Sequence, residues 1–128
     1  MFDPAGRLLL ILRGRPPGLG LWSVPGGRCL PDEPADQACV REVREETGLP
    51  VRIVRFAGRV ERDAPDGGVY VIDDFVCRVL DGENSPVAGD DARDVRWVTR
   101  AAFDALNDAG ELVPGLRAAL QEWDALPR

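Results

Sequence analysis

The feature that most constrains this chain is a run of fixed residue spacings between positions 27 and 49. Within it, the sequence REVREETGL places glutamates at 42, 45 and 46. On an α-helix, side chains three and four residues apart share one face. Like charges at this spacing destabilise a helix by about 0.2–0.5 kcal/mol per pair. The segment therefore predicts either a solvated acidic face or a helix whose carboxylates bind a divalent cation.

The other fixed positions separate these two interpretations. From Gly27 to Leu49 the chain fits the pattern G-x5-E-x7-R-E-(aliphatic)-x-E-E-x-G-(aliphatic). The fixed positions hold Gly27, Glu33, Arg41, Glu42, Val43, Glu45, Glu46, Gly48 and Leu49. With ordinary residue usage, nine such matches at one start position have a chance probability on the order of 10⁻⁹. This pattern is the Nudix box, and the chain resembles the Nudix (MutT-like) hydrolase family.

Local signals predict a loop, a helix and a second loop across this segment. The turn residues Pro25-Gly26-Gly27 come first, and Asp32 or Glu33 is expected to cap the helix, with Pro34 in its first turn. Gly48 favours the left-handed conformation that ends a helix. The carboxylates would then lie opposite a small apolar stripe. That stripe comprises Ala35, Ala38, Cys39 and Val43.

The rest of the chain predicts short strands with helices between and after them, which is typical of a layered α/β (α+β) protein. Strands are expected over residues 7–13, 21–25, 51–60, 69–80 and 94–98, and helices over 100–106 and 113–126. The family resemblance implies a Nudix fold, an α/β/α sandwich with a mixed β-sheet, spanning residues 1–128 as a single domain. In that family a strand normally precedes the turn at residues 3–6. Only Met1 and Phe2 precede it here, so we expect either a truncated first strand or a native chain that starts upstream of Met1.

Composition excludes several other classes of protein. The formal net charge of −6 argues against a nucleic-acid polymer as partner, since such binding needs a basic surface. The absence of histidine excludes imidazole catalysis and His-ligated zinc. No signal peptide is visible and no apolar run approaches about 18 residues, so we expect a cytoplasmic protein without a membrane partner. The three cysteines lack CxxC spacing and are expected to be reduced, with Cys39 and Cys77 in the core.

The resemblance implies hydrolysis, dependent on Mg²⁺ (or Mn²⁺), of the pyrophosphate bond in a nucleoside diphosphate linked to another moiety. Elementary chemistry agrees, because pyrophosphate oxygens repel a nucleophile until a cation neutralises their charge and activates water. The expected metal ligands are Glu42, Glu45 and Glu46, acting directly or through water. The family implies backbone carbonyls of Gly26 or Gly27 as further ligands. Arg41 is expected to hold Glu45 by a charge-assisted bond, the alternative being an ordinary surface pair.

The residue that accepts the proton from water stays open among Glu46, Asp90 and Asp91. The two aspartates belong to the sequence GDDA, for which an ordinary turn with capping aspartates is the alternative. Candidate substrate-binding residues are Arg13, Arg15, Trp22 and Asp90. Each arginine could equally be merely exposed, and core packing is the favoured alternative for Trp22. Pro65, 16 residues after Leu49, has a spacing associated with the ADP-ribose pyrophosphatase branch.

ADP-ribose or a nucleotide sugar is therefore the favoured substrate class. Nucleoside triphosphates come next, including oxidised ones such as 8-oxo-dGTP. A non-catalytic nucleotide-sensing Nudix domain is the alternative from another class, although such modules usually lose box carboxylates that this chain keeps. Messenger-RNA cap processing uses the same chemistry, but the net negative charge of the chain argues against an RNA substrate. An uncovered sheet edge would let two copies pair, so a homodimer is one further expectation.

Overall fold

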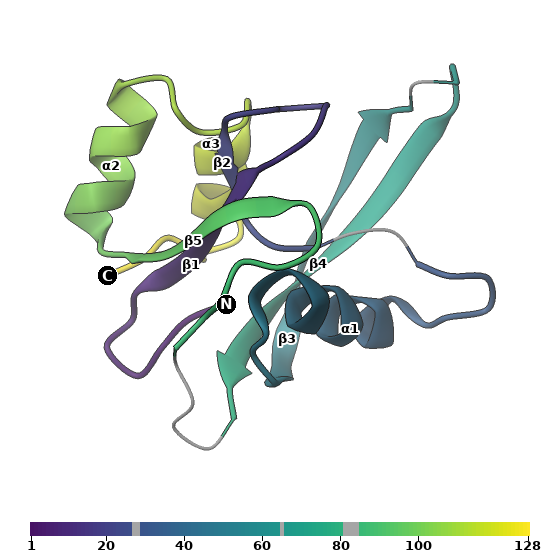
Figure 1. The fold of residues 1–128 in the computed structure, drawn as a ribbon, viewed down its shortest axis with the longest axis horizontal. Coiled ribbons are helices and arrows are strands. Elements are labelled where there is room, and N and C mark those ends of the chain that lie inside the picture. The colour runs from purple at the N-terminus through teal and green to yellow at the C-terminus, as the bar shows by residue number, and fades with distance from the viewer. Residues whose placement is uncertain (27–28, 65, 81–84) are drawn as a thin grey trace.

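The computed structural model describes residues 1–26, 29–64, 66–80 and 85–128. The strands are β1 (Leu8–Arg13), β2 (Trp22–Ser23), β3 (Val51–Asp63), β4 (Val69–Val79) and β5 (Ala92–Val98). The helices are α1 (Ala35–Thr47), α2 (Arg100–Asp108) and α3 (Leu116–Glu122). One sheet has the order β2-β1-β5, and β3 and β4 form a long hairpin beside it (Figure 1). All pairings between these strands are antiparallel. Parallel pairing in the described residues is confined to isolated bridges, Phe2 with Arg78 and Trp22 with Leu112.

Strand β1 lies at the centre of its sheet and contributes to two cores. Leu8 and Leu10 pack with α2 and α3, where Phe103 is fully buried. Leu9 points to the opposite face and packs with Val43 of α1. This division follows from the two-residue period of a strand. It places α1 on one side of the strands and α2 and α3 on the other, which confirms the predicted layered fold (Figure 1).

Met1 and Phe2 connect the two sheets. The Phe2 N–H donates to the Cys77 carbonyl at 3.1 Å, and the Met1 carbonyl accepts from the Leu9 N–H at 3.0 Å. Strand pairing before the turn at residues 3–6 is limited to the bridges that Phe2 makes with Leu8 and Arg78. Within the described residues, pairing ahead of this turn thus consists of these two isolated bridges.

Two predictions about helix ends are wrong. Pro34 is the N-cap of α1, and no side chain caps it. Glu33 does not cap the helix because Leu30 N–H and Arg41 occupy its carboxylate. The C-terminal helix is shorter than expected because Gly115, with φ of 81°, takes a left-handed conformation and α3 starts only after it. The predicted end of α1 is confirmed, since Gly48 has φ of 73° and its N–H donates to the Arg44 carbonyl.

Each helix in the described ranges falls short of the length and apolarity that crossing a bilayer requires.

Candidate functional site

Arg41 lies at the centre of a carboxylate network on α1. Its guanidinium donates to both carboxylate oxygens of Glu33, at 2.9 and 3.0 Å. It also donates to Glu42 at 2.9 Å and to the two oxygens of Glu45 at 3.1 and 3.2 Å. The hydrogen bonds from Arg41, assisted by the Leu30 N–H, lower the pKa of Glu33. The expected contact between Arg41 and Glu45 is therefore present, and sequence reasoning missed Glu33 as the bidentate partner.

Carboxylate oxygens of Glu42, Glu45 and Asp90 gather beside this network. One oxygen of each lies within 4.8 Å of the other two. Ligands of a single Mg²⁺ at 2.0–2.1 Å stand at most about 4.2 Å apart, so modest side-chain rotations would bring these oxygens into range. Oxygen donors are also those that Mg²⁺ and Mn²⁺ prefer. By geometry and donor type, the three residues fit a hard divalent cation.

The loop before β5 delivers Asp90 to α1 through close backbone contact. The Val87 N–H donates to the Thr47 carbonyl and the Gly89 N–H to the Glu46 carbonyl, both at 2.9 Å. A Cβ at residue 89 would stand 2.6 Å from the Glu45 carbonyl oxygen, so this approach requires glycine. Asp90 itself has φ of 51°, a left-handed conformation that aspartate tolerates better than most residues.

Glu46 is not a member of that three-carboxylate group and is only 8% exposed. Its carboxylate accepts a hydrogen bond from the Gly26 N–H at 3.1 Å, which ties α1 to the turn after β2. Burial raises the pKa of Glu46 to about 7, and the neighbouring charges of Glu42 and Asp90 act in the same direction. The hydrogen bond from Gly26 opposes this rise.

The remaining predicted site residues occupy different surroundings. Arg15 forms an ion pair with Asp91, and the Asp91 carbonyl accepts from the Gly14 N–H at 2.8 Å. Arg13 donates to the Pro17 carbonyl, and its charge lowers the pKa of Glu46. Gly27 and Pro65 lie outside the described residues.

Trp22 is 6% exposed and belongs to the core shared with α2 and α3. The guanidinium of Arg96 stands 4.7 Å from the centre of its ring. This is the packing arrangement that the sequence favoured for Trp22, and it leaves little ring surface for a ligand.

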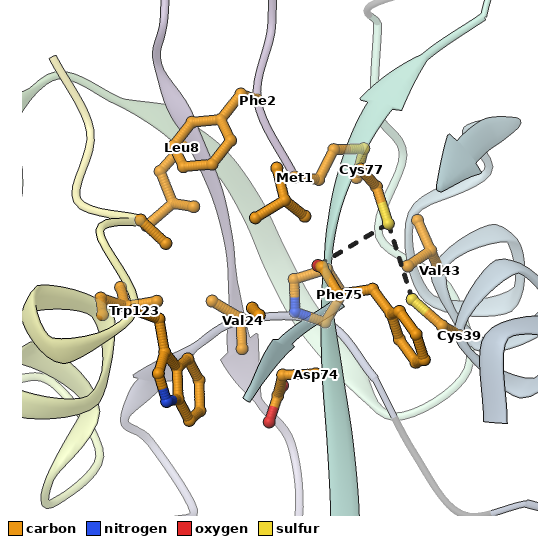
Figure 2. Close-up of a pocket in the computed structure, with 15 residues that line it drawn as sticks. Met1, Phe2, Leu8, Val24, Cys39, Val43, Asp74, Phe75, Cys77 and Trp123 are labelled. Atoms are coloured by element: carbon orange, nitrogen blue, oxygen red, sulfur yellow. Dashed lines mark hydrogen bonds between the residues drawn. The ribbon is translucent and has the colours of Figure 1, made fainter. Parts of the chain in front are cut away.

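A small cavity of about 50 Å³ lies between β4, α1 and α3. Figure 2 shows Met1, Val24, Asp74, Cys77 and Trp123 among the side chains that line it. Burial raises the pKa of Asp74 to about 6, and the charge of Arg62 partly offsets this rise. Asp74 is not among the candidate site residues that the sequence predicted.

Comparison with known proteins gives concordant matches. A family model described as NUDIX domain matches residues 1–120. The chain is 34% identical over 112 residues to a protein named ADP-ribose pyrophosphatase from Methanocaldococcus jannaschii, with 81% of this chain and 64% of that protein aligned. It is 37% identical over 95 residues to a protein named putative 8-oxo-dGTP diphosphatase 2 from Mycobacterium tuberculosis, with 73% and 65% aligned. The chain thus spans slightly less than two thirds of these relatives.

Among solved structures, the MutT NUDIX hydrolase from Burkholderia pseudomallei superposes with a TM-score of 0.72 and 26% identity. The superposition covers 94% of this chain and 91% of that one.

Proposed function

The chain belongs to the NUDIX family, and from this premise we propose that it hydrolyses the pyrophosphate bond of a nucleoside diphosphate linked to another moiety. ADP-ribose-like compounds are the favoured substrates, and Mg²⁺ or Mn²⁺ is the proposed cofactor. The observation that carries this proposal is the convergence of the Glu42, Glu45 and Asp90 carboxylates. The relative named ADP-ribose pyrophosphatase supports the choice of substrate.

In this proposal Glu42, Glu45 and Asp90 hold the cation, with Glu46 contributing through water. The bound cation would neutralise pyrophosphate charge and lower the pKa of the attacking water. Arg41 keeps Glu42 and Glu45 in place, since its guanidinium bonds to both. The proton acceptor is one of Glu46, Asp90 and Asp91, of which Asp91 is engaged in an ion pair with Arg15.

A second candidate function is hydrolysis of nucleoside triphosphates, oxidised ones included. The relative named putative 8-oxo-dGTP diphosphatase 2 supports it at a similar level of identity. A nucleotide-sensing role has less support, because each box carboxylate is present and Glu42 and Glu45 lie beside a third acidic residue.

The test is release of phosphate products, with Mg²⁺ or with EDTA, from a substrate panel. The panel contains ADP-ribose, nucleotide sugars, NADH, dinucleoside polyphosphates and canonical or oxidised dNTPs. We expect ADP-ribose-like compounds to be hydrolysed far faster than the rest of the panel, and only when Mg²⁺ is present. Binding of Mg²⁺ and nucleotide without any turnover would instead support the sensing role.

Matched variants connect this activity to the site. Glu45→Gln and Glu46→Gln should each leave folding intact and lower turnover by about two or more orders of magnitude, a loss within the range for groups acting on the transition state. Glu122→Gln, at an exposed position of α3, is the control and should behave as wild type. Full activity in both Glu45→Gln and Glu46→Gln would overturn the assignment of the metal site.

A further inference from the structure

Two thiols face each other where α1 packs against β4. The Sγ atoms of Cys39, on α1, and Cys77, on β4, lie 3.7 Å apart (Figure 2). The Cys77 thiol also lies 3.8 Å from the Phe75 carbonyl oxygen. The third cysteine, Cys29, is exposed and lies outside this pair.

The elements that carry the two thiols are fixed against each other. Cys77 pairs with Ile53 in the hairpin ladder and is only 1% exposed. Cys39 packs against the same core, which also contains Val43 and Leu9. The sulfur atoms are therefore held close together by packing. A disulfide needs a separation of about 2.05 Å, so bond formation requires about 1.7 Å of further approach. A rotation of the partly exposed Cys39 side chain can contribute much of it.

The cavity gives a small reagent access to both sulfur atoms. Cys39 and Cys77 both line this space of about 50 Å³. One water occupies about 10–15 Å³ on such a measure, so a molecule the size of hydrogen peroxide fits. The Cys39 thiol hydrogen-bonds to Cys77 and lowers the pKa of the Cys77 thiol. This favours the thiolate, which is the form that reacts with peroxide.

We propose that Cys39 and Cys77 are an oxidisable dithiol, a modification site that a small hydroperoxide converts into an intramolecular disulfide between α1 and β4. In the first step a thiolate sulfur attacks one peroxide oxygen and the O–O bond breaks. The products are a sulfenic acid and hydroxide, which takes up the thiol proton and leaves as water. The second sulfur, now a thiolate, attacks the sulfenic sulfur, an S–S bond forms and the S–O bond breaks. The hydroxide that leaves takes up the proton released when the first thiol ionised, which gives the second water. The two thiols lose two electrons and the peroxide gains them.

The disulfide would couple oxidation to the helix that carries the acidic site. Glu46 follows Cys39 by seven residues on α1 and Glu42 follows it by three, so both lie on the side of the helix that carries Cys39. The prediction that the carboxylates lie opposite the apolar stripe is therefore wrong for Glu46, which is buried on the packed side of α1. The bond would also close a loop between residues 38 apart in sequence. Such a cross-link should raise the melting temperature by about 10 °C in a domain of this size. This site does not depend on which substrate the protein uses.

The experiment uses the Cys29→Ser variant, in which Cys39 and Cys77 are the two remaining thiols. The reduced protein is treated with hydrogen peroxide, then denatured, alkylated and mapped as peptides without reductant. We expect the segments containing Cys39 and Cys77 to be linked, with the loss of two hydrogen atoms. We also expect the rise in melting temperature, and its reversal by dithiothreitol.

The matched control is Cys29→Ser/Cys39→Ser, which keeps the buried Cys77 and changes the partly exposed partner. It should show neither the linked peptides nor the shift in melting temperature. Wild-type protein in parallel reports the oxidant dose, because its exposed Cys29 must react. Sulfinic acid at Cys39 or Cys77, disulfides between chains, or intact thiols at both positions while Cys29 is oxidised would each overturn the proposal.

Discussion

Replacing Gly89 by alanine should move Asp90 away from the carboxylates of α1. The added Cβ would stand 2.6 Å from the Glu45 carbonyl oxygen, which belongs to the helix backbone and cannot rotate away. The loop must therefore shift outward. The hydrogen bond from the Gly89 N–H to the Glu46 carbonyl, now 2.9 Å, would lengthen or break.

The expected magnitudes follow from these contacts. Overpacking costs about 1–3 kcal/mol, and a lost hydrogen bond costs about 0.5–1.5 kcal/mol. Replacing glycine by alanine also lowers the conformational entropy of the unfolded chain, which stabilises the folded protein by about 0.4–1 kcal/mol. We therefore expect the free energy of unfolding to fall by about 0.5–4 kcal/mol. Because Asp90 would leave its position beside Glu42 and Glu45, Mn²⁺ affinity should fall at least about tenfold.

Gly68→Ala is the matched control for this prediction. A Cβ at residue 68 would approach only the flexible Asp66 carboxylate, at 3.3 Å, and the Ala64 Cβ, at 3.9 Å. Gly68→Ala therefore has the same effect on the entropy of the unfolded chain as Gly89→Ala, but it creates no clash with backbone atoms. Urea unfolding and Mn²⁺ titration of both variants measure the difference. If Gly89→Ala matched Gly68→Ala in stability and in Mn²⁺ affinity, the assembly of the site around this loop would be refuted.

Two further substitutions test the core. Burial raises the pKa of Asp74 to about 6 from 3.8, so the folded protein binds more protons than the unfolded chain between these values and loses stability as the pH rises through them. Asp74→Asn should therefore raise the free energy of unfolding by about 3 kcal/mol near pH 8, and by less than about 1 kcal/mol near pH 4; equal gains in urea titrations at the two pH values would contradict this. Gly58→Ala should lower the free energy of unfolding by about 1–3 kcal/mol, because the new Cβ would stand 2.1 Å from Trp123 Nε1. The double variant Gly58→Ala/Trp123→Leu should lose less than the sum of its single variants, and strict additivity would count against the clash.

Local geometry explains which parts of the candidate site could be predicted. The contact between Arg41 and Glu45 follows from their spacing of four residues on a helix. The bond from Arg41 to the adjacent Glu42 was not predicted by that spacing. The end of α1 follows from Gly48 in the same way. These features depend on residues within one or two turns of each other. For such residues, the sequence separation already determines the distance in space.

Asp90 could not be placed in this way because its position depends on contacts that are distant in sequence. Its sequence context, GDDA, is also that of an ordinary turn. The close approach of Gly89 to the backbone of Glu45 and Glu46 is what places Asp90 beside Glu42 and Glu45. Glu33 was misassigned as a helix cap for a related reason, because Arg41 competes for its carboxylate.

The charges of the assembled site bear on whether α1 presents a solvated acidic face or a cation site. Arg41 supplies one positive charge to Glu33, Glu42 and Glu45. A solvated face would be more stable if further carboxylates stayed away from it, since like charges at close range repel. The loop before β5 does the opposite, since it brings Asp90 to within 4.8 Å of Glu42 and Glu45 through an approach that only glycine allows. An arrangement that gathers negative charge in this way favours the binding of a divalent cation.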